Sequence, residues 1–371
     1  MHIAVPKEIK NHEYRVALTP SGARELAGRG HHVTLQAGAG DGAGFPDAAF
    51  EAAGARIEHD VEALWRDAEL ILKVKEPQPE EVARLSAGQT LFTYLHLAAE
   101  ERLTQGLMES GATCIAYETI TDRQGGLPLL APMSTVAGRM AVQAGAHSLE
   151  KAQGGAGILL PGVPGVAPAR VAVIGGGVVG ENAARMALGL GAEVTVLDTS
   201  IPRLEQLDDR YQGRMKTVYS TADALEQVVR ESDLVIGAVL VPGAAAPKLI
   251  TREMLADMKP GSVLVDVAID QGGCFATSQA TTHAEPTYLV DGVVHYCVAN
   301  MPGAVARTST QALTNATLPY IIALADKGWR QALADDPHFL AGLNVHDGRI
   351  THAAVAEAFG LRSQEASQVV S

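Results

Sequence analysis

The sequence has little of what marks several large classes of protein. Aromatic residues make up 4% of its 371 positions, and its 3 cysteines form neither a C-x-x-C pair nor a metal-binding spacing with histidine. No apolar run reaches the roughly 20 residues that cross a bilayer, and the amino-terminal segment becomes charged too early for a signal peptide. We therefore expect a cytoplasmic protein with free thiols, no metal site and no membrane contact.

The charge balance is acidic. With 29 lysines and arginines against 42 aspartates and glutamates, the net charge is −13. Such a field repels phosphate backbones, so nucleic acid is not an expected partner. An anionic small-molecule substrate would need local cationic side chains to hold it.

What is abundant is glycine, with 38 residues, and short apolar runs that alternate with helical patterns. This alternation predicts parallel sheets covered by helices, and the length suits two domains. We expect two Rossmann-like, doubly wound domains joined by long helices, with a cleft between them. Residues 1–133 with 306–371 form one expected domain, and residues 134–305 form the other. The expected strands cover residues 3–6, 32–35, 70–74 and 90–95 in the first domain, and 171–174, 193–198, 234–239 and 263–268 in the second.

A glycine-rich turn follows the strand at 171–174. Gly175, Gly177 and Gly180 satisfy G-x-G-x-x-G, and a helix follows them. In that context the first glycine permits a tight turn, the second lets a pyrophosphate approach, and the third lets the helix pack on the strand. A flavin, S-adenosylmethionine or no ligand at all would also be compatible with the turn alone.

An acid at the end of the next strand narrows the choice of ligand. Asp198 is placed to accept hydrogen bonds from ribose hydroxyls and to repel a 2′-phosphate, which favours NAD over NADP. Arg203 follows a few residues later and leaves NADP open. Residues 134–305 are therefore the expected NAD-binding domain, and residues 1–133 with 306–371 are the expected substrate and catalytic domain.

Two cations are candidates for holding a carboxylate. Arg15 follows the first strand, although a loop arginine is commonly only a solvated charge. Lys73 and Lys75 would share one face of a strand, and Lys75 stands at its carboxyl end, where ligands of parallel sheets gather. Lys75 is therefore the preferred residue.

Two further residues are candidates for proton transfer. His96 closes the strand at 90–95 and titrates near neutrality. Asp270 follows another strand end beside Gly272 and Gly273, where an Asx turn is the plain alternative. Asp266 lies further inside the same strand, and we expect it to have a structural role.

Several ordered segments resemble the alanine dehydrogenase and transhydrogenase alpha-subunit family. The resemblance spans nearly the whole chain. Its most specific strings are Arg15-Val16-Ala17-Leu18-Thr19-Pro20, Lys73-Val74-Lys75-Glu76-Pro77, Tyr94-Leu95-His96-Leu97-Ala98, Asp270-Gln271-Gly272-Gly273-Cys274 and His295-Tyr296-Cys297-Val298-Ala299-Asn300-Met301-Pro302-Gly303.

The resemblance implies an NAD-dependent oxidoreductase that interconverts L-alanine with pyruvate and ammonia and assembles as a homohexamer. It implies substrate binding by Arg15 and Lys75, and catalysis by His96 and Asp270. The implied cofactor contacts, together with the three motif glycines, are Ser134, Val178, Val179, Asp198, Arg203, Ser220, Val239, Leu240, Val267, Ala268, Ile269, Asp270, Val298, Ala299, Asn300 and Met301.

Two residues depart from the expected family pattern. Gln279 stands where a basic residue is common, and Ala276 stands where an acid is expected; both bear on cofactor affinity. The alternative functions are the NAD(H)-binding subunit of a proton-translocating transhydrogenase, or a saccharopine/lysine-type dehydrogenase.

Overall fold

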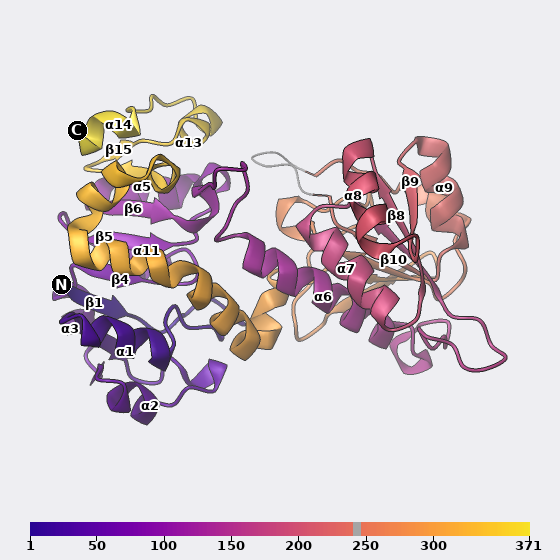
Figure 1. The fold of residues 1–371 in the computed structure, drawn as a ribbon, viewed down its shortest axis with the longest axis horizontal. Coiled ribbons are helices and arrows are strands. Elements are labelled where there is room, and N and C mark those ends of the chain that lie inside the picture. The colour runs from indigo at the N-terminus through magenta and orange to yellow at the C-terminus, as the bar shows by residue number, and fades with distance from the viewer. Residues whose placement is uncertain (240–245) are drawn as a thin grey trace. The chain divides into compact units, whose positions relative to one another are not determined.

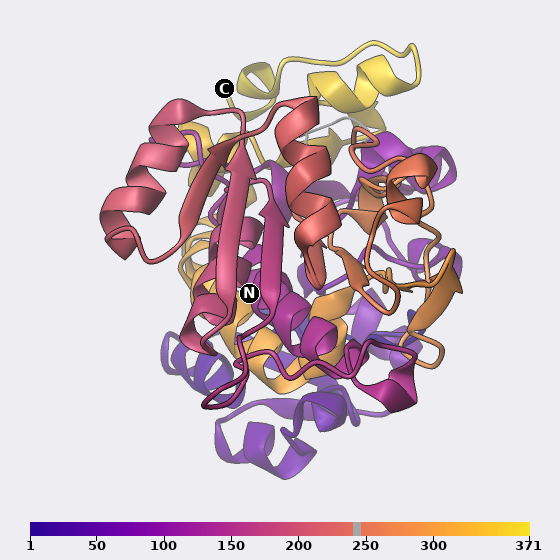
Figure 2. The same ribbon diagram turned by 90° about the vertical axis from the view of Figure 1, so that its right-hand side faces the viewer.

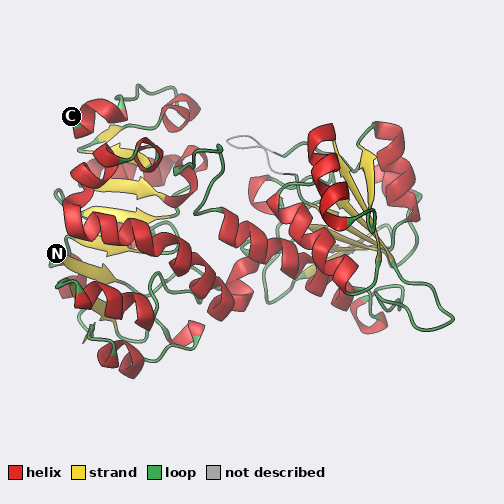
Figure 3. Cartoon of the chain, viewed as in Figure 1, coloured by secondary structure: helices red, strands yellow, loops and turns green. Residues whose placement is uncertain are grey.

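The chain folds into two compact units in a computed structural model that describes residues 1–239 and 246–371. Unit 1 comprises Met1–Met133 with Gly303–Ser371, and unit 2 comprises Ser134–Pro302. In each unit helices flank a central sheet (Figure 1, Figure 3). Among the described residues, no helix is long and apolar enough to span a bilayer.

Unit 1 is built on an eight-stranded sheet with the order β15-β14-β6-β5-β4-β1-β2-β3. Strands β1 to β6 run parallel, and β14 and β15 add an antiparallel edge. The strands are β1 (His2–Val5), β2 (His32–Gln36), β3 (Arg56–Glu58), β4 (Leu70–Leu72), β5 (Thr90–Thr93), β6 (Thr113–Ala116), β14 (Leu343–His346) and β15 (Arg349–Ile350).

Both faces of this sheet are buried at its centre. All residues of β4 and β5 are buried, as expected for strands covered on both sides. Alternate residues point to opposite faces, so Ala4, Ile71 and Leu91 pack in one layer with Trp65 and Leu107. Although aromatic residues are scarce in the sequence, the buried side chains of unit 1 include Phe92 and Tyr117.

The helices of unit 1 are short, with one exception. They are α1 (Pro20–Gly28), α2 (Asp47–Ala52), α3 (Val61–Arg66), α4 (Pro79–Val82), α5 (Glu101–Ser110), α11 (Ala306–Asp335), α12 (Pro337–Leu340), α13 (Ala353–Ala358) and α14 (Ala366–Val370). The long helix α11 is interrupted at Gly328, whose φ is +76°. Helix α1 is capped by the Thr19 side chain, which accepts a hydrogen bond from the Gly22 amide, and Pro20 opens its first turn.

Unit 2 contains a seven-stranded sheet among its described residues, with the order β12-β13-β11-β10-β7-β8-β9. In Figure 2 the rose-coloured strands of this sheet lie between helices. Apart from the antiparallel edge strand β12, neighbouring strands are parallel. The order β9-β8-β7-β10-β11-β13 is that of a dinucleotide-binding sheet, 3-2-1-4-5-6. The strands are β7 (Arg170–Ile174), β8 (Glu193–Asp198), β9 (Lys216–Tyr219), β10 (Leu234–Gly237), β11 (Val263–Asp266), β12 (Thr287–Val290) and β13 (Val293–Tyr296).

The helices of unit 2 among the described residues are α6 (Ala131–Ser148), which begins in unit 1, α7 (Val178–Gly189), α8 (Ile201–Tyr211), α9 (Ala222–Glu231) and α10 (Arg252–Ala256). Helix α7 follows the glycine-rich turn and packs against β7. A Cβ atom at Gly180 would lie 1.7 Å from the carbonyl oxygen of Gly175, so only glycine lets the helix approach this closely. Gly175 itself has a φ of +95°, which glycine adopts readily.

The structure confirms two doubly wound sheets and corrects several details. Strands β4 and β5 end at Leu72 and Thr93, so strand alternation does not govern Lys73 and Lys75 as predicted. The predicted strands also omitted the parallel strands β3, β6, β9 and β13 and the antiparallel edge strands β12, β14 and β15, all of which are short. Helix α11 runs eleven residues beyond its predicted end at 324, to Asp335.

Close packing at Gly180 yields a stability prediction. Gly180→Ala should lower the free energy of unfolding of unit 2 by about 1–3 kcal/mol, because the added methyl group forces α7 away from the turn. Gly189→Ala, on the same helix, is the matched control, since its Cβ would meet no atom within 4 Å. Urea unfolding followed by circular dichroism measures both. Equal midpoints for the two variants would contradict this account of Gly180.

Candidate active site

Three predicted site residues follow neighbouring parallel strands of unit 1. Arg15 lies in the loop after β1, Lys75 lies three residues beyond β4, and His96 lies three residues beyond β5. Strands β1 and β4 are adjacent in the sheet, although β2 and β3 intervene in the chain, so the strand order reverses direction between them. Ligands of parallel sheets bind at this reversal, outside the carboxyl ends of the strands.

Arg15 is buried and held in a fixed orientation. Its side chain is 2% exposed, and its Nε donates to Oε1 of Glu13 at 2.7 Å. The backbone amide of Arg15 donates to the same carboxylate at 3.0 Å, and Nη1 lies 3.1 Å from the sulfur of Met133. Burial alone would lower the pKa of Arg15, but Glu13 outweighs it and raises the pKa above its usual range. The guanidinium is thus a permanent cation in a low-dielectric setting.

The two lysines after β4 have different surroundings. Lys73 is fully buried, and its Nζ lies 2.8 Å from Oε2 of Glu8 and 2.9 Å from Oε1 of Glu81. Burial would lower the pKa of Lys73, but the two carboxylates raise it. Lys75 is only partly buried, and its backbone amide donates to Glu8 at 3.4 Å. Lys73 therefore holds the end of β4 to Glu8 and Glu81, while Lys75 is the lysine that a ligand can reach.

His96 is exposed and stands in an unusual backbone conformation. Its φ is +53°, in the left-handed region that residues other than glycine seldom adopt and that is found often at functional sites. Its ring stacks on Tyr94, with centroids 5.8 Å apart and planes 6° apart. Tyr94 is buried and donates its hydroxyl to the carbonyl oxygen of Leu129. Burial raises the pKa of Tyr94, so the hydroxyl keeps its proton as a donor.

In unit 2 the described residues among the predicted cofactor contacts lie at or after the carboxyl ends of parallel strands, save Ser134, which lies in α6. The motif glycines, Val178 and Val179 come after β7, Asp198 ends β8 and Arg203 comes after it, Ser220 comes after β9, and Val239 comes after β10. Val267, Ala268, Ile269 and Asp270 come after β11, and Val298, Ala299, Asn300 and Met301 come after β13. Leu240 lies outside the described residues. Six strands thus present candidate contacts at one edge of the sheet.

The glycine-rich turn has the shape needed for a diphosphate. Gly177 is exposed, and a Cβ placed there would meet no atom within 4 Å, so its backbone can be approached closely. Gly177 also caps α7 without any side-chain hydrogen bond, which leaves the helix's first amides open to a ligand's anionic oxygens. The chain's own residues therefore fit a dinucleotide here.

Asp198 and Arg203 are arranged around the same turn. Asp198 Oδ2 accepts the Gly176 amide at 2.6 Å, and a carboxylate retains further lone pairs for ribose hydroxyls. Arg203 donates Nε to the Gly176 carbonyl oxygen at 2.6 Å and forms an ion pair with Glu181. The pairing with Glu181 commits the arginine within the protein, which disfavours its use on a 2′-phosphate.

The loop after β11 contains the exposed Asp270 and is held in place by the buried Asp266. Asp266 is fully buried, and its carboxylate accepts the backbone amides of Ala268 at 3.0 Å and Cys274 at 2.9 Å. This agrees with the prediction that Asp266 is structural. Cys274 is buried beside Asp266, and burial raises the pKa of its thiol far above the usual range, as expected for an unreactive thiol.

Several residues that organise the site were not identified from the sequence. No motif of the sequence assigns a role to Glu8, Glu13, Tyr94 or Met133. Each acts through a contact that only the folded chain reveals. The detectable signal was closeness in sequence, of Glu8 and Glu13 to Arg15 and of Tyr94 to His96; Met133, 118 residues from Arg15, gave no such signal.

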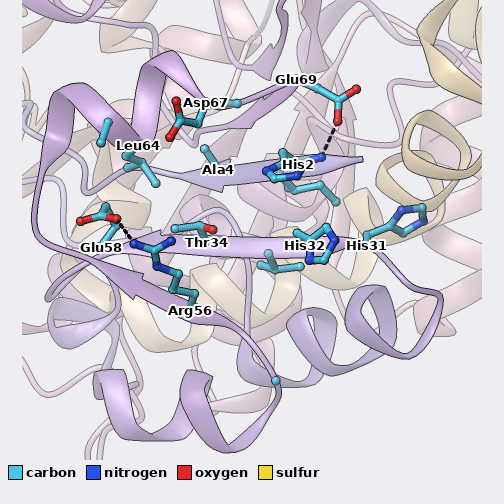
Figure 4. Close-up of a pocket in the computed structure, with 15 residues that line it drawn as sticks. His2, Ala4, His31, His32, Thr34, Arg56, Glu58, Leu64, Asp67 and Glu69 are labelled. Atoms are coloured by element: carbon cyan, nitrogen blue, oxygen red, sulfur yellow. Dashed lines mark hydrogen bonds and ion pairs between the residues drawn. The ribbon is translucent and has the colours of Figure 1, made fainter.

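A surface pocket of about 550 Å³ lies elsewhere in unit 1, on β1, β2, β3 and α3 (Figure 4). Its lining includes His2, His32, Arg56, Glu58 and Glu69. The predicted substrate and catalytic residues of unit 1 are not in its lining. It is therefore distinct from the candidate active site.

The fold and sites define a two-unit α/β protein with a dinucleotide-binding turn on one sheet and a cationic strand-end site on the other. Family models described as alanine dehydrogenase/PNT, N-terminal domain and C-terminal domain match residues 4–137 and 141–353. An alanine dehydrogenase from Halomonas elongata is 86% identical over 370 residues, covering 100% of both chains.

Solved structures agree. An L-alanine dehydrogenase superposes with a TM-score of 0.94 at 51% identity, covering 97% of this chain and 99% of that one. A transhydrogenase from Sinorhizobium meliloti superposes with a TM-score of 0.82 at 28% identity, covering 95% and 100%. The chain belongs to the alanine dehydrogenase/PNT family, and it is an oxidoreductase that uses a nicotinamide cofactor and small-molecule substrates.

The contrast between the lysines gives a paired prediction. Lys73→Met should lower the free energy of unfolding by about 3–5 kcal/mol, because it leaves two buried carboxylates without their cation. Lys75→Met should change stability by less than about 1 kcal/mol, since Lys75 is only partly buried, and should instead weaken substrate binding. Thermal unfolding and steady-state kinetics distinguish the two. If Lys75→Met proves the more destabilising change, the two assignments are reversed.

Proposed function

We propose that this protein catalyses the NAD-dependent interconversion of L-alanine with pyruvate and ammonia in the cytoplasm. The observation that carries the proposal is the full-length 86% identity to the Halomonas elongata alanine dehydrogenase. The arrangement of Arg15, Lys75 and His96 at three neighbouring strand ends supports it.

The cations of unit 1 are proposed to hold the substrate. Arg15 is a permanent cation whose Nε and Nη2 already donate to Glu13, so a substrate carboxylate would be bound through Nη1, which lies beside the Met133 sulfur. Lys75 stands at the same strand edge, where its ammonium can bind the substrate carboxylate or carbonyl oxygen. These local charges are necessary because the protein as a whole is strongly negative and repels anions.

His96 and Asp270 are proposed to move protons. Loss of a hydride from Cα and of a proton from the amine gives an imine, to which water adds. His96 takes a proton from the attacking water, and Asp270 assists at the amine or the water. Collapse of the carbinolamine then releases ammonia and pyruvate. In the reverse direction His96 returns the proton to oxygen.

Unit 2 is proposed to bind the cofactor through the turn at Gly175, Gly177 and Gly180. When bound, NAD⁺ supplies the hydride acceptor and NADH the hydride donor. Asp198 is proposed to select NAD by accepting hydrogen bonds from the ribose hydroxyls, and the Arg203–Glu181 pair supports the same preference. We also propose a homohexamer, on the family resemblance.

The test is an assay of NADH oxidation by the purified protein with pyruvate and ammonium. Oxidation should require both substrates and should be faster with NADH than with NADPH. The similarity to a transhydrogenase makes hydride exchange between NADH and an oxidised NADP analogue the alternative activity to measure, with and without membranes. Exchange without any dependence on pyruvate and ammonium would replace the proposal with that second function.

Replacement of the proposed proton carrier gives a second test. His96→Ala should lower kcat by roughly 10²–10⁴-fold, the usual contribution of a positioned acid–base group. NADH affinity should stay nearly unchanged, because the proposed cofactor contacts lie in unit 2. His147→Ala is the control, since that side chain is 62% exposed. Unchanged turnover in His96→Ala would remove His96 from the mechanism.

A further inference from the structure

Glu118 holds the backbone that carries His96. It lies in the 3₁₀ helix Tyr117–Thr119 that follows β6, the strand next to β5. Its Oε1 accepts the amide of His96 at 2.6 Å and that of Leu95 at 3.1 Å, and its Oε2 lies 3.2 Å from the Leu95 amide. One carboxylate thus binds two consecutive amides where β5 has ended.

These amides need an acceptor because the sheet no longer supplies one. Strand β5 stops at Thr93, and the chain turns at His96, with a φ of +53°, into the 3₁₀ helix Leu97–Ala99. A carboxylate is acceptor-only and makes stronger hydrogen bonds to amides than a neutral oxygen does. The left-handed conformation of His96 is therefore maintained by a specific interaction from a neighbouring strand.

We propose that Glu118 is a positioning residue for His96. This inference rests on the proposed function, in which His96 transfers protons. Glu118 holds the His96 backbone in the left-handed conformation, and Tyr94 supports the imidazole from one face. With both constraints in place, the ring is presented in one orientation; without Glu118, the backbone relaxes and the ring leaves its stacked position.

The surroundings of Glu118 are consistent with this role. In the part of the chain that the structure describes, Glu118 makes no ion pair. Burial lowers the pKa of His352, and the negative charge of Glu118 raises this pKa by less than burial lowers it. The histidine is thus neutral at neutral pH, and the backbone amides are the principal partners of the carboxylate.

Two glutamates beside the other candidate site residues of unit 1 bind backbone amides in the same way. Glu13 accepts the Arg15 amide, and Glu8 accepts the Val74 amide at 2.6 Å just before Lys75. Both are also buried ion-pair partners, so their removal would disturb the fold. Glu118 is the member of this group whose positioning role can be tested apart from stability.

The experiment compares Glu118→Gln and Glu118→Ala with Glu58→Gln. Glu58 ends β3 at the far edge of the same sheet, and its Oε1 accepts the amides of His59 and Asp60, both at 3.0 Å. It therefore has the same kind of contact away from the site, beside Arg56 (Figure 4). Glutamine keeps one acceptor oxygen but turns an NH₂ group toward an amide, and alanine keeps none.

We expect kcat to fall by roughly 10-fold in Glu118→Gln and 100-fold in Glu118→Ala, the scale of a misplaced catalytic group. The KM for NADH should stay within about 2-fold of wild type, since Glu118 acts on proton transfer rather than on cofactor binding. Glu58→Gln should retain wild-type kcat and KM. Wild-type kcat in a folded Glu118→Gln protein would overturn the inference.

Amide hydrogen exchange of the peptide containing Leu95 and His96 provides a readout that does not require activity. Exchange should be slow in wild type and in Glu58→Gln, and at least 10-fold faster in Glu118→Gln. Unchanged exchange in Glu118→Gln would show that Glu118 does not hold this segment. If wild type itself is inactive with pyruvate and ammonium, the proposed function fails, and exchange alone decides whether the Glu118 contact exists.

Discussion

The organisation of the molecule depends on the parallel direction of the central strands in each sheet. Parallel strands bring all their carboxyl ends to one edge, so residues far apart in sequence meet there without any long-range motif. In unit 1 this edge collects Arg15, Lys75 and His96, and in unit 2 it collects the glycine-rich turn and Asp198. The chemistry of each unit is therefore a property of its strand order as much as of individual side chains.

Charge is handled differently at the two edges. Unit 1 concentrates cations in a protein that is negative as a whole, and each cation is stabilised by buried or partly buried glutamates. Glu13 fixes Arg15, whereas Glu8 and Glu81 neutralise Lys73 and leave Lys75 less constrained. Unit 2 instead presents backbone amides, with Asp198 and the Arg203–Glu181 pair at the side of the turn. The two edges therefore offer different kinds of hydrogen-bond donor, cationic side chains in unit 1 and backbone amides in unit 2.

The sequence predicted the elements whose signal is local. The glycine turn and the acid at Asp198 follow from positions relative to apolar runs, and the structure places both at strand ends as expected. The choice of Lys75 over Lys73 stays a prediction, because β4 ends at Leu72 and Lys75 lies three residues beyond it. The edge strands β12, β14 and β15 were missed because short antiparallel strands have little pattern of their own. Glu118 could not be found either, since it contacts His96 across 22 residues through a neighbouring strand. Strand limits were overestimated because the apolar runs continue past the last ladder hydrogen bond.

Both sheets share the strand order 3-2-1-4-5-6, yet their first helices begin differently. In unit 1, Thr19 caps α1 with its own side chain and Pro20 removes an amide donor from the first turn. In unit 2, Gly177 begins α7 with no side-chain cap. The first amides of α7 are thus open to a diphosphate, whereas those of α1 are occupied by the Thr19 side chain or removed by Pro20. For a chain with two such sheets, the expected binding stoichiometry is one dinucleotide per polypeptide rather than two.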